Sequence, residues 1–154
     1  MKGWRVFPAS RGDAGLLAAL HRAAFAEPWS PATLGELLAM PGAFAWLAGS
    51  EAKAGPEPVG FVLGRIAGGE CEILTLAVTP AARRQGAASA LLEAALSHAA
   101  TAGAIAVFLE VAASNRAARR LYARGGFAMV GRRKAYYRRR GQAPLDALIL
   151  RRPL

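Results

Sequence analysis

One stretch near the middle of the chain limits the possible folds more than any other feature. Residues 73–78 form an apolar run with the bulk of a buried strand. Thr79-Pro80 ends that strand, because a proline cannot donate a hydrogen bond to a ladder. From Gln85 to about Thr101, apolar residues recur at helical spacing. The stretch therefore predicts a strand, a tight turn and a helix in direct succession.

The turn between this strand and this helix has the chemistry of an anion site. The first turn of a helix has unpaired N–H groups, and its dipole favours negative charge. Gly86, Ala87 and Ala88 carry almost no side chain, so a phosphate could approach their backbone, and Arg83 and Arg84 add positive charge. The alternative is a basic first turn on an ordinary strand–helix unit. The turn matches neither a P-loop nor a dinucleotide-binding Gly-x-Gly-x-x-Gly turn.

Length and composition narrow the protein class. The 154 residues are most simply one domain, 1–154, and a content of 54% apolar residues argues against disorder. The net charge of +10 suits an anionic ligand, nucleic acid or a ribosomal neighbourhood, or else a solvated surface rich in arginine. Cys71 is the single cysteine, which excludes an internal disulfide and fits a reducing cytoplasm.

No targeting or membrane segment is expected. Residues 1–8 carry positive charge, but no apolar segment of a signal peptide follows them. The most apolar helix contains Glu93 and His98 and is too short to span a bilayer. We therefore expect a cytoplasmic protein.

The rest of the chain divides into alternating strands and helices. Seven strands are expected, at residues 4–7, 43–48, 59–67, 70–78, 105–111, 127–137 and 144–150. Four helices are expected, at residues 14–25, 31–40, 85–101 and from Asn115 to Gly125-Gly126. The strands at 43–48, 59–67 and 70–78 read as an antiparallel meander with a tight turn at Gly68-Gly69. The last two strands read as an antiparallel pair joined by residues 138–143.

Local signals set the expected ends of these elements. Pro8 is expected to end the first strand, Asp13 to cap the first helix, and Ser30 to cap the second with Pro31 at its first position. Asn115 is expected to cap the fourth helix. The first helix should direct four side chains inward: Leu16, Leu17, Leu20 and Phe25.

Glu110 is the most informative single residue. It interrupts a run that is apolar on both faces, which is typical of a central strand. A buried carboxylate costs several kcal/mol unless it is paired or opens on a cavity. Burial of this kind raises the pKa of a carboxyl group towards the range of a general base. The alternatives are an ion pair with an arginine, or a strand end that is open to solvent.

Other polar residues give weaker signals. Asn115 and Tyr122 are two helical turns apart and share a face, although an N-cap role explains Asn115 well and a core aromatic role explains Tyr122 adequately. His21 and His98 lack a second ligand at metal spacing, so we expect no metal site. No nucleophilic triad is recognisable around the candidate nucleophiles Cys71, Ser97 and Ser114.

Two motifs resemble a known superfamily. The turn Arg83-x-x-Gly86-x-Ala88 resembles the acetyl-CoA pyrophosphate loop of the GNAT superfamily of N-acetyltransferases, Gln/Arg-x-x-Gly-x-Gly/Ala. A later segment resembles the second acetyl-CoA motif of that superfamily and lies at the right spacing from the loop: Asn115-x-x-Ala118-x-x-Leu121-Tyr122-x-x-x-Gly126-Phe127. Within it, the chain is similar to the ribosomal-protein-alanine N-acetyltransferases of the RimI type. That similarity rests on Pro28-Trp29-Ser30, Leu109-Glu110-Val111, Ala113-Ser114-Asn115, and Tyr136-Tyr137 followed by Asp146-Ala147.

The resemblance implies a fold and a set of roles. The fold would be α/β (α+β): a single domain with a mixed, mostly antiparallel sheet, helices on its faces and a parallel strand pair at the cofactor cleft. Glu110 would be the proton acceptor, Tyr122 the proton donor, and Asn115 would bind acetyl-CoA near its thioester. The pantetheine arm would bind the backbone of Leu76, Ala77 and Val78. The pyrophosphate would be wrapped by Arg84, Gln85, Gly86, Ala87, Ala88 and Ser89. The peptide groove would be lined by Trp29, Tyr136 and Tyr137, for which ordinary aromatic packing is the alternative.

The same resemblance implies the reaction but leaves the acceptor open. Acetyl-CoA would be the cosubstrate, without a metal, and the acceptor would be the N-terminal alanine of a small-subunit ribosomal protein, by direct attack. Residues 138–145 are basic where related enzymes often carry acidic residues, so another amine acceptor is an alternative. A basic RNA- or ribosome-binding module is a second alternative, motivated by Arg132, Arg133, Lys134 and Arg138 to Arg140, although no RNA-binding motif is present. Retention of both Glu110 and Tyr122 argues against a non-catalytic acetyl-CoA sensor. We expect no stable binding to nucleic acid or membranes.

Overall fold

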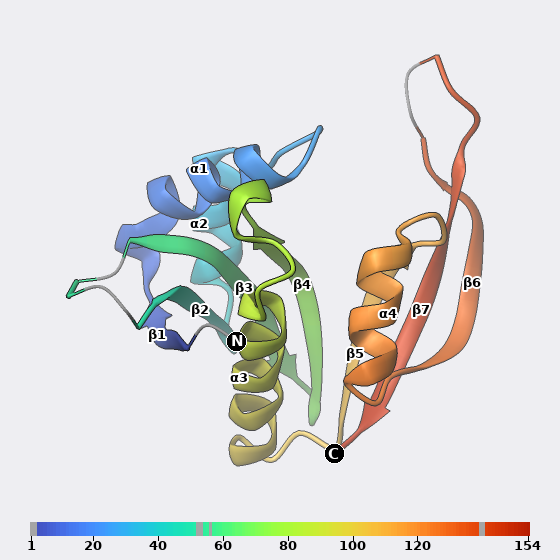
Figure 1. Ribbon diagram of the computed structural model, residues 1–154. Helices are drawn as coiled ribbons and strands as arrows, with labels where there is room; N and C mark the ends of the chain where they lie inside the picture. Colours follow the sequence, from blue (N-terminus) through green and yellow to red (C-terminus); the bar gives the residue numbers. More distant parts are fainter. Residues whose placement is uncertain (1–2, 52–53, 56, 139–140) are drawn as a thin grey trace.

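The computed structural model describes residues 3–51, 54–55, 57–138 and 141–154. The seven strands of this part form one sheet in the order β1-β2-β3-β4-β5-β7-β6 (Figure 1). The strands are β1 Trp4–Ala9, β2 Ala43–Ser50, β3 Pro58–Ala67, β4 Glu70–Val78, β5 Ala106–Ala112, β6 Ala128–Tyr137 and β7 Leu145–Pro153. The helices are α1 Ala14–Ala24, α2 Pro31–Ala39, α3 Ala87–Thr101 and α4 Arg116–Arg124, with 3-10 turns η1 Arg11–Asp13 and η2 Pro80–Ala82.

Strand pairing follows the chain for the first four strands and then changes. β1 to β4 form an antiparallel meander, and β4 pairs with β5 in parallel. Gly68 and Gly69, with φ of 59° and 77°, form the two-residue turn between β3 and β4. β7 lies between β5 and β6 and is antiparallel to both, so β5 is a central strand as expected. The expected fold class, with its mixed sheet and one parallel pair, is confirmed.

Helices cover both faces of the sheet and create two cores. On one face, α1 and α2 pack on the meander around residues such as Leu17, Leu34 and Phe61. On the other face, α3 and α4 pack around residues such as Leu91 and Val107. Apolar side chains on both faces therefore hold β3 and β4 in place, whereas β5 places its core residues Val107, Leu109 and Val111 on the α3 side.

A β-bulge in β4 marks the point where this strand separates from β5. Leu63 pairs with Thr75 and Gly64 with Ile73, so Leu74 is an extra residue in β4. Side chains change faces at this point: Ile73 belongs to the α3 side of the sheet, whereas Ala77 belongs to the α1 side. The β4–β5 pairing also ends here, at Ile73 and Leu109. Beyond the bulge the two strands diverge, β4 remaining with β3 and β5 with β7 (Figure 1).

Each expected strand and helix is present, with shifted ends. Pro8 does not end the first strand; β1 continues to Ala9, and Pro8 pairs with Trp46. A proline is tolerated there because β1 is an edge strand, so its nitrogen needs no partner on the outer side. Of the loop expected at 138–143, residues 139 and 140 lie outside the described part.

The first helix differs most from its prediction. Leu16 and Phe25, expected inward, are 37% and 39% exposed, because the buried face of α1 is centred on Leu17, Leu20 and His21. Asp13 holds the N-cap position, but its carboxylate accepts from the Ser10 N–H at 2.8 Å. It therefore closes the preceding turn η1 rather than capping α1. By contrast, the Ser30 cap of α2 is confirmed: its Oγ accepts from Thr33 N–H at 3.1 Å.

Candidate active site

The predicted anion-binding turn lies between the end of β4 and the start of α3. Gly86 is the N-cap of α3 and has a φ of 92°, a left-handed conformation that favours glycine. The first hydrogen bond of the helix runs from Ala90 N–H to Gly86 O at 3.0 Å. The N–H groups of residues 86–89 therefore lie outside the helical ladder, and they concentrate positive potential at this end of α3.

Two predicted residues hold this turn together rather than facing a ligand. Arg83 donates through Nε to Val78 O and through Nη2 to Ala24 O, both at 3.2 Å. Gln85 donates through Nε2 to Ala81 O at 3.1 Å. Arg84 has an exposed side chain and a φ of 61°, which is uncommon for a residue with a Cβ. Arg83 is exposed as well, but two backbone carbonyls hold its guanidinium in the turn.

The segment Leu76, Ala77 and Val78 follows the bulge. These residues pair with β3 but lie beyond the last β4–β5 pair. Alternate backbone N–H and C=O groups on the β5 side are consequently outside the ladder. Such groups, in a strand already held on its other side by β3, are suited to bind an extended amide-containing ligand.

Glu110 lies at the point where β5 separates from β4. It is the first residue of β5 after the last pair with β4, at Leu109. Its Oε1 forms an ion pair with Arg133 Nη2 at 3.2 Å, and its side chain is 25% exposed. Of the alternatives open from the sequence, the arginine ion pair is therefore present. The Arg133 guanidinium also lies over the Tyr136 ring, 5.0 Å from its centroid.

A bulge in β6 accompanies the approach of Arg133 to Glu110. The β6–β7 register shifts between Arg133 and Tyr137, and Ala135 has a φ of 54°. The carboxylate of Asp146 on β7 accepts from Ala135 N–H at 2.8 Å and from Arg132 Nε at 2.7 Å. These bonds, the backbone one first, hold the pKa of Asp146 below its usual range. Asp146 thus fixes the bulge, which sequence reasoning missed because it depends on cross-strand register.

Tyr122 and Tyr137 are electrostatically coupled in the same region. Tyr122 on α4 is 8% exposed, and its ring meets that of Phe127 edge-on at 5.7 Å between centroids. Burial, with a contribution from Tyr137, raises the pKa of Tyr122 to about 12. Burial first, and then the charge of Glu110, raises the pKa of Tyr137. The charge of Glu110 therefore acts on Tyr137, and Tyr137 in turn acts on Tyr122.

Trp29, on the loop between α1 and α2, is anchored to β4 through a buried histidine. Its ring stacks on His21, 4.9 Å between centroids, and its backbone N–H donates to His21 Nδ1 at 3.0 Å. Because Nδ1 accepts, the proton lies on Nε2, which can donate to Thr75 Oγ1 at 3.2 Å. Burial lowers the pKa of His21, which favours this neutral form. In the sequence, His21 stood out only as a histidine without a second ligand at metal spacing, and no motif marked Thr75.

Asn115 is the N-cap of α4. Its Oδ1 accepts from Ala118 N–H at 3.1 Å, so the capping interpretation of this residue is confirmed. The cap orients α4 so that Tyr122 is directed into the core between the sheet and the helices. The structure thus brings Glu110, Tyr122 and Tyr137 together and leaves Asn115 at the helix end.

Comparison with known proteins agrees with this geometry. Residues 16–127 match the acetyltransferase (GNAT) family. The chain belongs to this family. It is 37% identical to N-alpha-acetyltransferase RimI of Mycobacterium tuberculosis over 149 residues, covering 93% of this chain and 88% of that protein. The structure is similar to the ribosomal-protein-S18-alanine N-acetyltransferase from Escherichia coli, with a TM-score of 0.87, 26% identity, and 98% and 94% of the two chains covered. Arabidopsis thaliana NAA60 in complex with acetyl-CoA shares the fold, with a TM-score of 0.85, 23% identity and 99% of both chains covered.

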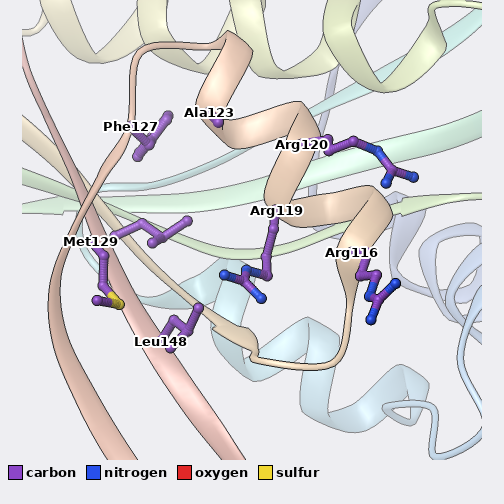
Figure 2. A pocket seen from close by; sticks show the side chains of 8 residues that line it. Arg116, Arg119, Arg120, Ala123, Phe127, Met129 and Leu148 are labelled. Atoms are coloured by element: carbon purple, nitrogen blue, oxygen red, sulfur yellow. The ribbon is translucent and has the colours of Figure 1, made fainter.

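One cavity of this GNAT acetyltransferase lies away from the predicted site. It has a volume of about 490 Å³ and lies between α4 and the strands β6 and β7. Its lining consists of Arg116, Arg119, Arg120, Ala123, Phe127, Met129, Leu148 and Leu150. Figure 2 shows Arg119 extending towards Leu148 and Met129, whereas Arg116 and Arg120 point to the other side of α4. Since none of the predicted site residues lines this cavity, it is separate from the candidate active site.

Among the residues that the structure describes, no group of three or more His, Cys, Asp and Glu side chains is arranged to hold a metal ion. Nor does the described part contain a helix that is both long and apolar enough to cross a membrane.

Proposed function

We propose that this GNAT enzyme transfers the acetyl group of acetyl-CoA to the N-terminal α-amino group of a protein, the alanine of a small-subunit ribosomal protein. The observation that carries the proposal is the divergence of β4 and β5. Glu110 is the first residue of β5 beyond its pairing with β4. The part of β4 beyond that pairing leads into the anion-binding turn. A ligand bound to the turn and to β4 would therefore present its far end to Glu110.

The residues present fit acetyl-CoA. The N–H groups of residues 86–89 and the exposed guanidinium of Arg84 suit a pyrophosphate. The backbone of Leu76, Ala77 and Val78 suits the amides of a pantetheine arm. Asn115 uses its Oδ1 for the helix cap, so its amide nitrogen is the group that would donate to the cosubstrate. When bound, acetyl-CoA supplies a thioester carbonyl carbon that an amine can attack.

Glu110 and Arg133 support the deprotonation of an amine. An α-ammonium group has a pKa of about 8, so a single general base is sufficient to form the nucleophile. Glu110 would accept that proton, directly or through a water. The Arg133 guanidinium 3.2 Å from Glu110 disfavours a second cation nearby, which lowers the pKa of the bound amine. Attack of the amine would form the N–C bond and break the C–S bond, and the second proton of the amine would pass to solvent.

Tyr122 is suited to protonate the leaving thiolate. Its phenol has a pKa of about 12 and is therefore protonated at neutral pH. Burial would also raise the pKa of a thiol leaving group in the same site, as it raises the pKa of the buried Cys71 thiol to about 11. The two pKa values would then be comparable. Cys71 itself is 1% exposed and poorly ionised, which favours direct transfer over an acyl-enzyme.

The acceptor groove is proposed to lie between the Trp29 loop and the end of β6. Trp29 is fixed on one side by His21, and Tyr136 and Tyr137 pack edge-on at 5.2 Å on the other. Exposed basic residues of β6, Arg132 and Lys134 among them, would repel an arginine-rich peptide. This observation favours, as a second candidate, a less basic protein N-terminus or another amine. The names of the two RimI-type relatives support the first candidate, the N-terminal alanine of a ribosomal protein. The buried free thiol of Cys71 fits a cytoplasmic location.

The proposal is tested by measuring thiol release from acetyl-CoA with four acceptors. They are an alanine-starting peptide from the ribosomal protein, its N-terminally blocked copy, a blocked peptide with one lysine, and a polyamine. Glu110→Gln is compared with Glu93→Gln, which changes an exposed carboxylate on α3. We expect turnover with the free alanine peptide alone, a loss of 10²- to 10⁴-fold in Glu110→Gln, and full activity in Glu93→Gln.

Each other outcome points to a different function. Turnover with the lysine peptide or the polyamine would retain the acetyltransferase but exclude N-terminal specificity. Equal activity of Glu110→Gln and the unmodified protein would exclude Glu110 as the base. Tight acetyl-CoA binding without turnover would indicate a sensor, and the absence of both would exclude acetyl-CoA as the cosubstrate.

A further inference from the structure

A tryptophan at the start of β1 contacts the anion-binding turn from behind. The Trp4 indole Nε1–H donates to the backbone oxygen of Gln85 at 2.7 Å, across 81 positions of sequence. The bond is partly buried, and the ring packs against the core under α3. A short bond at a partly buried site orients the acceptor carbonyl strongly.

The bonded carbonyl lies between two residues in the left-handed region. Arg84 has a φ of 61° and Gly86 a φ of 92°. A non-glycine residue in this region costs roughly 1 kcal/mol and persists where its surroundings hold it. The Trp4 bond is one such restraint, and the Gln85 side-chain bond to Ala81 O is another.

The geometry of a peptide unit links this bond to ligand binding. The carbonyl of Gln85 and the N–H of Gly86 belong to one planar trans peptide, so they point in opposite directions. Drawing the carbonyl towards Trp4 therefore turns the Gly86 N–H away from the core. That N–H is one of the four groups outside the α3 ladder that are available to an anion.

We infer that Trp4 is a positioning residue for cosubstrate binding: its indole N–H orients the Gln85–Gly86 peptide so that the Gly86 N–H faces the pyrophosphate. This inference rests on the proposed use of acetyl-CoA. It assigns to the N-terminal strand a task that no motif of the chain records. Because Trp4 does not touch the reacting atoms, its loss should affect cosubstrate affinity and leave the chemical step unchanged.

The chain offers a matched control on the neighbouring strand. Trp46 on β2 also packs against the core under α3, and its buried Nε1 has no hydrogen-bond partner among the described residues. Trp46→Phe therefore removes an indole without removing a bond, whereas Trp4→Phe removes both. A second variant replaces Trp4 by 3-benzothienylalanine, which keeps the ring shape and removes only the N–H donor.

The experiment compares acetyl-CoA with S-acetylpantetheine, which lacks the pyrophosphate. We expect both Trp4 variants to raise the Kd and KM for acetyl-CoA three- to tenfold, the effect of about one hydrogen bond, with kcat within twofold. The KM for S-acetylpantetheine should not change, and Trp46→Phe should leave both KM values unchanged. If Trp4 had a merely structural role, its replacement would raise the KM values for acetyl-CoA and S-acetylpantetheine together. That result would overturn the inference.

Failure of the inference is distinguishable from failure of the proposed function. If the unmodified protein binds acetyl-CoA and the benzothienyl variant binds it equally well, Trp4 does not position the turn. If the unmodified protein binds no acetyl-CoA, the proposed function itself is wrong, and the inference falls with it.

Discussion

The Arg133 guanidinium lies 3.2 Å from the Glu110 carboxylate, and it reaches that position from the edge strand β6 across β7. The pair therefore depends on the register of three strands. It places a fixed positive charge beside the group proposed to accept the proton of the amine. We therefore expect this charge to act mainly on the pKa of the bound amine.

We predict that Arg133→Gln moves the acidic limb of the kcat–pH profile to higher pH. Without the cation, a bound ammonium is stabilised and the pKa of the amine rises, so more alkaline conditions are needed to form the nucleophile. Arg133 is 51% exposed, so screening limits the shift to about 0.5–1 pH unit. Arg133→Lys keeps the charge and should keep the profile. Identical profiles for the glutamine variant and the unmodified protein would contradict the proposed effect on the amine.

Tyr122 is predicted to remain protonated across the working pH range. Because the pKa of its phenol is about 12, ionisation of Tyr122 should produce no alkaline fall in kcat below about pH 10. Tyr122→Phe should lower kcat by 10²-fold or more, with an unchanged Kd for acetyl-CoA. Tyrosinate absorbance at alkaline pH, compared between the two proteins, gives the pKa directly. A step below pH 10 that disappears in Tyr122→Phe would exclude this assignment.

The elements of the fold could be predicted because their signals are local. Ser30 before Pro31, the Gly68-Gly69 pair and Asn115 each act through their own neighbours in sequence, and the structure confirms each of them. The interior position of β5 was also predicted from its apolar run, although the core residues Val107, Leu109 and Val111 all lie on one face of the sheet.

The parts that could not be predicted depend on contacts between distant strands. Leu74 is an apolar residue within a mainly apolar strand, so nothing in the sequence marks it as the extra residue at which β4 leaves β5. The Glu110–Arg133 pair was open for the same reason, since many arginines could have reached the carboxylate. His21 fits the apolar face of α1, and only the folded chain places it between Trp29 and Thr75.

His21 is predicted to make the folding stability depend on pH. Burial lowers its pKa from 6.5 in the folded protein, so the unfolded chain binds more protons below neutral pH. This stability is fully present above pH 6.5 and is lost as the pH falls below it. The slope that His21 contributes is at most about 1.4 kcal/mol per pH unit. Urea unfolding at pH 7.5, 6.5 and 5.5 measures it.

Two variants isolate the contribution of His21 from that of the carboxyl groups. His21→Gln should have a flatter dependence of unfolding free energy on pH, whereas His98→Gln, which retains the buried histidine, should keep the original slope. If His21→Gln loses as much stability between pH 7.5 and 5.5 as the unmodified protein, the pH dependence arises elsewhere.

Two glycines should respond in opposite directions to the same substitution. A Cβ at Gly60 on β3 would lie 2.5 Å from the backbone oxygen of Ala77, on the segment proposed to bind pantetheine. Backbone cannot move as a side chain can, so Gly60→Ala should cost roughly 1–3 kcal/mol and weaken acetyl-CoA binding. Gly15 lies within α1, where a Cβ would meet nothing within 4 Å, so Gly15→Ala should stabilise the protein by about 0.5–1 kcal/mol. Urea unfolding measures both changes, and a Gly60→Ala protein as stable as the unmodified one would show that β3 and β4 are not closely packed there.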